Sequence, residues 1–203
     1  MSTDFQVLLV CTGNVCRSPF AEALFRDRFR ATEEIRFVSA GTDALVGEGM
    51  FEATRLTASR YGVADSGGHQ ARQLTTADLE AADLILVMTT EQRRHVVELS
   101  PRVTRRVFTL REFARLTAVT SDEDLRMEMG GPGISDAEKV RGAVRAVALA
   151  RGGLTPLTLA SDLDVVDPYQ QAMDVHAVSA QQIIEATNVV VELFSRALHV
   201  SMP

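Results

Sequence analysis

Cysteine is scarce in this chain of 203 residues, which contains only Cys11 and Cys16. A secreted domain held together by disulfides would carry more cysteines, spread along its length, so the chain is not a disulfide scaffold. The low count favours the reducing cytoplasm as the compartment. Two thiols so close together near the N-terminus point to cysteine chemistry instead of cross-linking.

Long apolar runs and an excess of basic charge are also missing. No stretch approaches the roughly 20 apolar residues that a membrane-spanning helix needs, and the apolar run at residues 5–10 is too short for the core of a signal peptide. The formal net charge is −6, whereas nonspecific nucleic-acid binding requires a basic surface. We therefore expect no membrane insertion and no nucleic-acid partner.

Glycine and proline, with 13 and 6 copies, are too few for a low-complexity or fibrous chain. Apolar residues make up 46% of the sequence, which is enough for a substantial core. The length is that of one large α/β domain, so we expect a single domain spanning residues 1–203. No group of histidine, cysteine and acidic residues has the spacing of metal ligands, so we expect no metal and no cofactor.

Strand-like and helix-like segments alternate along the chain. Strands are predicted at residues 7–10, 35–38, 84–88 and 106–109, where short apolar runs are typical of strands covered on both faces. Helical patterns are found at residues 18–29, 51–61, 76–82, 90–99, 111–116 and 180–198. This alternation predicts an α/β fold with a parallel sheet and right-handed crossovers.

Residues 120–166 interrupt the alternation. A connection of this length is too long for an ordinary loop and is expected to carry its own helix. Ser135 is a suitable N-cap for a helical run that continues to Ala150 and ends before Gly152-Gly153. We expect a mostly helical insertion here, and no motif in it indicates a function.

The segment from Cys11 to Pro19 lies between a predicted strand and the start of a helix. Ligands of α/β sheets bind at the carboxyl ends of the strands, where this segment is placed. Backbone N–H groups of the turn and the helix dipole favour an anion there, and would hold Cys11 as a thiolate. The planar fork of Arg17 can bind two phosphoryl oxygens. The segment therefore predicts a phosphate-binding loop with a cysteine nucleophile.

Other residues of this loop fit the same interpretation. Ser18 and Pro19 suit the N-cap and the first helical position, and the Ser18 hydroxyl can also donate to the thiolate. Gly13 and Asn14 tolerate the positive φ that a tight anion-binding turn requires. The alternative is that Cys11 is a small buried hydrophobe and that its spacing to Arg17 arose by chance. The strand before the loop and the Ser-Pro pair after it favour chemistry.

The segment from Cys11 to Pro19 resembles, residue for residue, the signature loop of the low-molecular-weight protein tyrosine phosphatases. That family also carries the loop at its N-terminus. Ser-Ala-Gly-Thr at 39–42, Gly-His-Gln-Ala-Arg at 68–72 and Asp-Pro-Tyr at 167–169 are similar to family segments in the family's order. The resemblance implies a three-layer α/β/α fold with a central four-stranded parallel sheet, to which the insertion is added.

The resemblance also implies hydrolysis of phosphotyrosine in two steps through a phosphocysteine intermediate. Cys11 is then the nucleophile, Arg17 binds the phosphate, and Asp167 is the general acid that later activates water. The loop residues implied to bind the phosphate group are Thr12, Gly13, Asn14, Val15, Cys16 and Ser18. The alternative for Asp167 is a surface turn, because Asp-Pro is a common turn dipeptide. Asp162 and Asp164 are nearby carboxylates, but neither is followed by Pro and an aromatic residue.

Two further residues match supporting positions of the family. Ser39 and His69 would form, with Asn14, a hydrogen-bond network behind the loop. His69 could equally be a polar surface residue in a glycine-rich turn. Cys16 could form a reversible disulfide with Cys11 that protects the nucleophile, or could be a small loop residue.

Tyr169 is expected to stack on the aromatic ring of the substrate. Leu45 lies near the place where family members often carry another aromatic residue, and Gln170 follows Tyr169 where many relatives have a second one. Relatives that dephosphorylate arginine have Thr at the position of Val15, whereas an aliphatic residue fits tyrosine-directed enzymes. We therefore predict a phosphotyrosine protein as substrate, with a bacterial tyrosine kinase as one example. The chain is expected to be a monomer or a weak homodimer.

Two other functions stay open from the sequence. The first is an arsenate reductase, a type of enzyme that resembles this family in fold and loop. Such reductases pass electrons through a relay of thiols and use further cysteines downstream of the loop. None follows Cys16, but a reductase that uses an external small thiol escapes this objection. The second is a phosphoprotein-binding module without turnover. Loss of the nucleophile, the arginine or the acid would favour that module, and all three are present.

Overall fold

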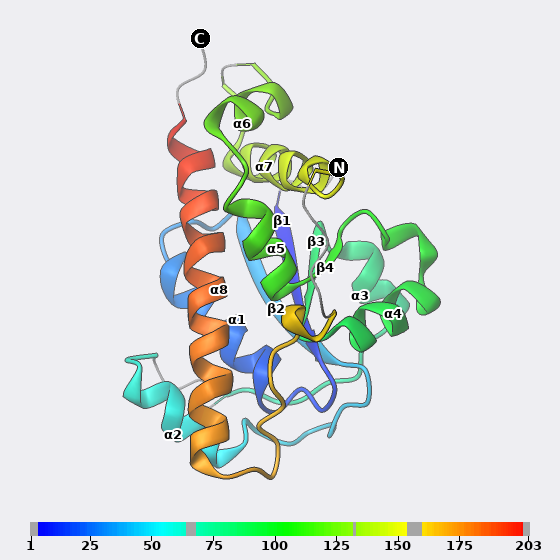
Figure 1. The fold of residues 1–203 in the computed structure, drawn as a ribbon, viewed down its shortest axis with the longest axis vertical. Coiled ribbons are helices and arrows are strands. Elements are labelled where there is room, and N and C mark those ends of the chain that lie inside the picture. Colours follow the sequence, from blue (N-terminus) through cyan, green and yellow to red (C-terminus); the bar gives the residue numbers. More distant parts are fainter. Residues whose placement is uncertain (1–3, 64–67, 132, 154–159, 201–203) are drawn as a thin grey trace.

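Four parallel strands form the central sheet of the computed structural model, which describes residues 4–63, 68–131, 133–153 and 160–200 (Figure 1). The strands are β1 (Phe5–Cys11), β2 (Ile35–Gly41), β3 (Leu84–Val87) and β4 (Val107–Thr109). Their order in the sheet is β2-β1-β3-β4, so β1 is paired on both sides. The predicted α/β fold with a four-stranded parallel sheet is confirmed.

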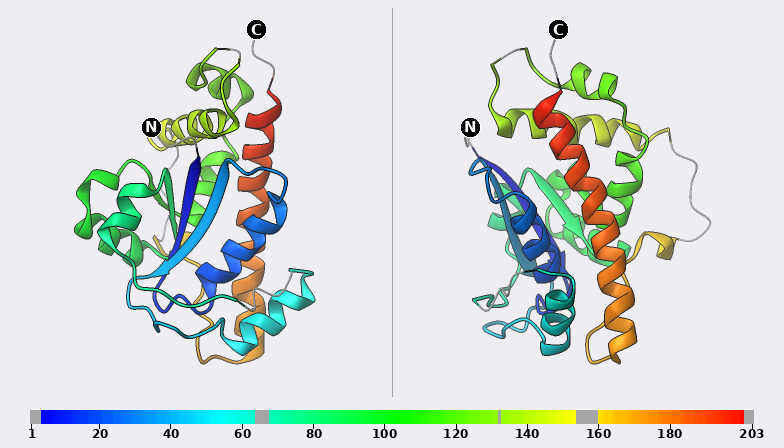
Figure 2. Two further views of the ribbon diagram at one scale, coloured as in Figure 1. Left: turned by 180° about the vertical axis from the view of Figure 1, so that it is seen from behind. Right: turned by 90° about the vertical axis from the view of Figure 1, so that its left-hand side faces the viewer.

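Helices cover both faces of this sheet (Figure 2). On one face lie α1 (Arg17–Arg28), α5 (Leu110–Thr117) and α8 (Met173–His199), with α2 (Glu52–Arg60) beside α1 and α8. On the other face lie α3 (Thr76–Ala81) and α4 (Thr90–Leu99). A short 3₁₀ helix, η1 (Pro101–Val103), leads from α4 to β4.

Strand β1 belongs to two hydrophobic cores at once. Val7 and Leu9 face the cluster formed with α1, α5 and α8, whereas Leu8 and Val10 face the cluster formed with α3 and α4. All four side chains are fully buried, as the alternation of side chains along a strand requires when both faces are covered. The strand that ends in Cys11 is therefore held from both faces and both edges.

Helix α8 begins at Met173, earlier than the predicted start at residue 180. Its first turns bury His176 and Ser179 instead of apolar residues. The apolar periodicity that identifies an amphipathic helix therefore appears only from Ala180 onward. The prediction of the start was wrong because the first turns of this helix pack with polar side chains.

The described part of the predicted insertion is mostly helical. It contains α6 (Asp122–Glu128), α7 (Asp136–Ala150) and a 3₁₀ turn, η2 (Ala160–Leu163), while residues 132 and 154–159 lie outside the described residues. Figure 1 shows α6 and α7 at the end of the sheet where β1 begins. Buried side chains of α7, among them Val140 and Val147, join the core on the α1 and α8 side. Among the described residues, no helix combines the length and the apolar character needed to cross a membrane.

Gly142 marks a close contact between α7 and the end of α6. A Cβ atom at Gly142 would lie 3.0 Å from the carbonyl oxygen of Glu128 and 3.2 Å from Cα of Met129. Replacing a glycine inside a helix by alanine ordinarily stabilises the helix by about 1 kcal/mol. Here we expect Gly142→Ala to lower the free energy of unfolding by about 1–3 kcal/mol, because the added methyl group overpacks the contact. Urea denaturation measures this change.

Gly152 provides the control, because a Cβ there would meet nothing within 4 Å. Gly152→Ala should change the free energy of unfolding by less than about 0.5 kcal/mol. A Gly142→Ala variant that is as stable as the native protein, or more stable, would show that α6 and α7 do not approach each other this closely.

Candidate active site

The loop between β1 and α1 holds the predicted nucleophile and the predicted phosphate-binding arginine. Cys11 is the last residue of β1 and Arg17 is the first of α1, and both side chains are buried. Sγ of Cys11 and Oγ of Ser18 lie 3.0 Å apart. In this geometry the serine hydroxyl can donate a hydrogen bond to the thiolate, as the sequence predicted.

The other predicted role of Ser18 was wrong, because the N-cap of α1 is Cys16. Ser18 therefore lies within the first helical turn, and Pro19 is the third helical residue instead of the first. The physical reason is that the Ser18 hydroxyl is already engaged. It lies against Cys11 and accepts a hydrogen bond from Nδ2 of Asn14 at 2.9 Å, so it does not cap the helix.

Asn14 holds the loop together from its centre. Its φ is +55°, in the left-handed region, and it is fully buried. Its Nδ2 also donates to Oγ of Ser39 at 2.9 Å, and its Oδ1 accepts from the backbone N–H of Arg72 at 3.0 Å. Nε2 of His69 donates to its carbonyl oxygen at 2.7 Å. The structure thus brings Ser39 and His69 together with Asn14, and these bonds offset the strain of its backbone.

Gly13 does not adopt the positive φ that was expected of it, and Asn14 alone does so in the loop from residue 11 to 17. Gly13 instead contacts the segment that carries Leu45. Its carbonyl oxygen accepts from the backbone N–H of Leu45 at 3.0 Å, and a Cβ at Gly13 would touch the side chains of Leu45 and Val15. Leu45 therefore lies over the loop, with 40% of its surface exposed.

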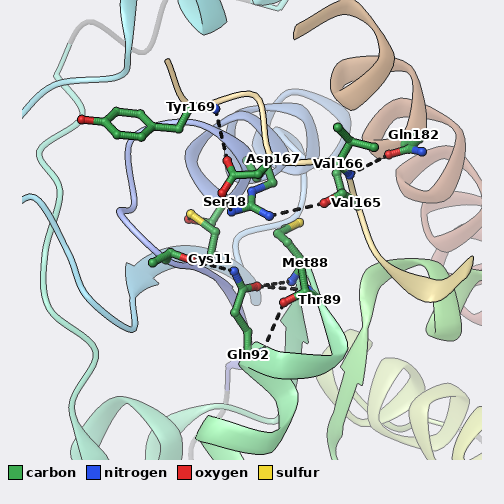
Figure 3. Close-up of polar contacts among 12 residues, drawn as sticks. Cys11, Ser18, Met88, Thr89, Gln92, Val165, Val166, Asp167, Tyr169 and Gln182 are labelled. Atoms are coloured by element: carbon green, nitrogen blue, oxygen red, sulfur yellow. Dashed lines mark hydrogen bonds and ion pairs between the residues drawn. The ribbon is translucent and has the colours of Figure 1, made fainter. Parts of the chain in front are cut away.

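Two contacts with the loop region were not predicted. Glu22 on α1 accepts from the Ser39 hydroxyl at 2.6 Å, which extends the network to a carboxylate. On α4, Nε2 of Gln92 donates to Oγ1 of Thr12 at 3.0 Å while its Oε1 accepts from the backbone of Met88 and Thr89 (Figure 3). The Thr-x-x-Gln spacing of residues 89–92 is a capping box and predicts the bonds at the start of α4, but it gives no signal for the contact with Thr12.

The predicted acid, Asp167, lies directly over the phosphate loop. Its Oδ2 is 2.6 Å from Nη2 of Arg17, and Nη1 of the same guanidinium donates to the carbonyl oxygen of Val165 at 3.3 Å. The arginine side chain is 4% exposed and the carboxylate 53% exposed. Asp167 is therefore the counter-ion of a nearly buried arginine, and about half of its own side chain is open to solvent.

Several elements anchor the segment that carries Asp167. The backbone N–H of Val165 donates to the carbonyl oxygen of Met88 at the end of β3 (2.8 Å), and that of Val166 donates to Oε1 of Gln182 on α8 (2.9 Å, Figure 3). Asp164 accepts from the backbone N–H of Thr90 at 2.7 Å, at the start of α4. Asp164 is thus a cap of α4 and not a rival for the acid.

Tyr169 packs against an aromatic residue that the sequence did not suggest. The backbone N–H of Tyr169 donates to Oδ1 of Asp167 at 3.1 Å, and its ring meets that of Phe51 edge-to-face, with centroids 5.5 Å apart. Phe51 in turn donates its backbone N–H to the carbonyl oxygen of Val15 at 2.8 Å. Phe51 directly precedes α2, and nothing in its local sequence distinguishes it from a core residue. Gln170, at φ +57°, turns the chain beyond the tyrosine.

Cys16 is buried behind the loop, and this burial raises the pKa of its thiol to about 12. It therefore stays protonated and is not the nucleophile. Both Cys11 and Cys16 are free thiols in this structure. Among the described residues, no group of three or more His, Cys, Asp or Glu is arranged to hold a metal ion.

Comparison with known proteins agrees with this geometry. Residues 6–126 match the family model described as low molecular weight phosphotyrosine protein phosphatase. The probable low molecular weight protein-tyrosine-phosphatase EpsP of Ralstonia solanacearum is 37% identical over 123 residues, which cover 61% of this chain and 80% of that protein. A protein-arginine-phosphatase of Geobacillus stearothermophilus is 31% identical over 128 residues, which cover 63% and 81%.

A solved structure extends the likeness to nearly the whole chain. The low molecular weight protein tyrosine phosphatase from T. tengcongensis superposes with a TM-score of 0.65 at 26% identity, covering 93% of this chain and 99% of that one. The family predicted from the loop is therefore confirmed. The chain belongs to the low molecular weight phosphotyrosine protein phosphatase family.

Proposed function

We propose that this phosphatase hydrolyses phosphotyrosine in proteins through a phosphocysteine intermediate on Cys11. The observation that carries the proposal is the convergence of three groups on one loop. The Cys11 sulfur lies 3.0 Å from the Ser18 hydroxyl, and the Asp167 carboxylate is held on Arg17 above the loop. A nucleophile, a phosphate ligand and a proton donor are thus within reach of one phosphoryl group.

In the first step the Cys11 thiolate attacks phosphorus, and an S–P bond forms as the bond to the tyrosyl oxygen breaks. Arg17 and the backbone N–H groups of the loop bind the non-bridging oxygens, whose charge shifts in the transition state. A phosphate oxygen takes the place of the Asp167 carboxylate on Nη2 of Arg17. Protonated Asp167 is then free to give its proton to the leaving phenoxide.

In the second step water attacks the phosphocysteine. The Asp167 carboxylate takes a proton from this water while the S–P bond breaks, and inorganic phosphate forms. The thiolate that leaves is stabilised by the Ser18 hydroxyl, which lies 3.0 Å from the sulfur. Proton and charge are both restored, so the cycle needs no metal ion and no redox partner.

The surroundings of the loop favour an aryl substrate. Val15 presents an aliphatic side chain without a hydroxyl, and Tyr169, 37% exposed, offers a ring beside the acid. The relative named as an arginine phosphatase makes phosphoarginine the second substrate to compare. A phosphotyrosine peptide and a phosphoarginine peptide of the same sequence, assayed side by side, decide between the two.

The proposal also covers the compartment, the protein substrate and the oligomeric state of the enzyme. Both cysteines are free, which fits the cytoplasm of a bacterial cell. A tyrosine kinase that carries phosphotyrosine is a substrate of the proposed kind, and the enzyme would act as a monomer or a weak homodimer. The site residues that would carry these roles, besides Cys11, Arg17 and Asp167, are Thr12, Gly13, Asn14, Val15, Cys16, Ser18, Leu45, Ser39, His69 and Tyr169.

Variants of the nucleophile and the acid test the mechanism. We expect Cys11→Ser to abolish hydrolysis of para-nitrophenyl phosphate near pH 6, because a serine hydroxyl in this loop is a far weaker nucleophile than a thiolate. Asp167→Asn should lower kcat by about 10²–10⁴-fold, because proton transfer to the leaving group is lost. Both variants should still bind inorganic phosphate.

Other outcomes of this assay point to the rival functions. A native protein that binds phosphate or vanadate but turns over no ester would favour the phosphoprotein-binding module. A protein that instead reduces arsenate in the presence of glutathione would favour the reductase that uses an external thiol.

Removal of metal ions gives a second test. We expect kcat and KM for para-nitrophenyl phosphate to stay within about twofold of their values when EDTA is added, because Arg17 and backbone N–H groups meet the phosphate charge. Loss of activity in EDTA, restored by adding back a divalent cation, would contradict the mechanism.

Asp164 allows a test of how the acid is positioned. Asp164→Ala removes the acceptor that joins the acid loop to the start of α4, and we expect kcat for phenyl phosphate to fall about tenfold. The loss should be smaller for para-nitrophenyl phosphate, because its leaving group needs less help from an acid. Asp162→Ala, at an exposed side chain of η2, is the matched control. Equal losses on both substrates would mean that Asp164 supports the fold and not the acid.

A further inference from the structure

Three aromatic rings, those of Tyr169, Phe51 and His176, contact one another in sequence beside the acid loop. The Tyr169 ring meets Phe51 edge-to-face at 5.5 Å, and the imidazole of His176 stacks on Phe51 at 5.8 Å with an interplanar angle of 10°. Phe51 also bonds through its backbone N–H to Val15 of the phosphate loop. The ring that borders the substrate is therefore supported by Phe51, and Phe51 is supported by His176.

His176 is fixed in its place from two sides. It lies in the first turns of α8 and is 2% exposed. Its Nδ1 is hydrogen-bonded to Oγ1 of Thr54 on α2 at 3.3 Å. One imidazole thus joins α8 and α2 at the point where both approach the acid loop, and the reaction steps derived above make no use of it.

The environment of the ring suits a neutral imidazole. Its Nε2 has no hydrogen-bond partner among the described residues, and it lies in a small cavity bordered by Cys16, Arg17, Pro168 and Ser179. A protonated ring would carry a second N–H, which makes no hydrogen bond in this arrangement, in a cavity that Arg17 also borders.

The charged and titratable groups around the ring are few. Cys16 lies on its side of the phosphate loop, and Arg17 is at the start of α1. Asp167 acts on the ring from the acid loop, and Asp174 is on the same helix as His176. Helix α2 contributes only threonines to the cavity. Burial lowers the pKa of His176 below its usual value, and the charge of Asp167 acts in the opposite direction. Cys16 is a neutral thiol, so it offers the ring no counter-charge.

We propose that His176 is a positioning residue for aryl substrates: its neutral ring holds Phe51, and through Phe51 it holds Tyr169 as one wall of the cleft. The inference rests on the proposed function in so far as the cleft takes an aryl phosphate. The phosphate group itself is bound by the loop, whose bonds do not involve His176. Loss of the ring should therefore weaken binding of the aryl part and leave binding of phosphate unchanged.

Two substitutions separate the ring from its hydrogen bond. His176→Phe keeps a ring to stack on Phe51 and loses the bond to Thr54, whereas His176→Gln keeps a polar group and loses the ring. The probes are benzylphosphonate, which carries an aryl group and is not hydrolysed, and inorganic phosphate. Their dissociation constants are measured by calorimetry near pH 7.5. His199→Gln, at the exposed end of α8, is the control.

The native protein should bind benzylphosphonate more tightly than phosphate. In His176→Gln we expect the affinity for benzylphosphonate to fall about 3–10-fold, the range of one aromatic pair, with phosphate binding changed less than about twofold. His176→Phe and His199→Gln should retain the native preference. Three results would each overturn the inference. They are an equal loss of benzylphosphonate affinity in His176→Phe and His176→Gln, an unchanged affinity in His176→Gln, or a parallel loss of phosphate binding.

The pH dependence gives a readout that packing alone would not move. Because its pKa is lowered, the His176 ring in the folded protein is neutral at and above pH 6.5, the ordinary pKa of histidine. The ring becomes protonated only as the pH falls further, through its folded-state pKa. The native preference for benzylphosphonate should decline over that range, whereas that of His176→Phe should not. Ionisation of the ligand affects both proteins equally, so the ratio of their affinities isolates the histidine.

These measurements do not depend on turnover. If the native protein binds benzylphosphonate as expected but hydrolyses no ester, the proposed function fails and the role of His176 stands. If the native protein hydrolyses aryl esters yet shows no preference for benzylphosphonate over phosphate, the role of His176 fails and the proposed function stands.

Discussion

The buried amide of Asn14 is the constraint on which the active site depends. A left-handed backbone at an asparagine is tolerated only where the surroundings hold it, and here the side chain and carbonyl bond to α1, to β2 and to the segment at residues 69–72. The turn then carries the chain from the end of β1 to the start of α1 with Cys11 facing Ser18. Because β1 is packed on both faces, the position of the sulfur is set by the whole sheet.

A nearly buried arginine needs a counter-charge, and the acid supplies it. Arg17 is held by Asp167 and the carbonyl oxygen of Val165. In the proposed mechanism the same carboxylate leaves this position when a phosphate arrives, since both would use the guanidinium fork. The ion pair thus holds the proposed acid at the phosphate loop, with about half of its side chain exposed.

The insertion explains why the acid could be expected from its motif but not placed. After α5 the chain passes through α6 and α7 at the opposite end of the molecule, and it returns so that Val165 bonds to Met88 at the end of β3. The return is secured by contacts with α4 and α8, at Thr90 and Gln182. The large separation in sequence between the nucleophile and the acid is therefore closed by hydrogen bonds to regular elements.

The sequence by itself determined the strands, most helices and the phosphate loop, because these depend on residues that are neighbours in the chain. The apolar run before Cys11 and the spacing to Arg17 are local patterns, and they identified the family and suggested the proposed chemistry. Only the tertiary structure decided that α8 starts at Met173 and that Cys16 occupies the N-cap position of α1. It also decided that Phe51 and His176 support Tyr169. These features arise from contacts between residues far apart in the chain, several of them between polar groups, which leave no apolar periodicity to read.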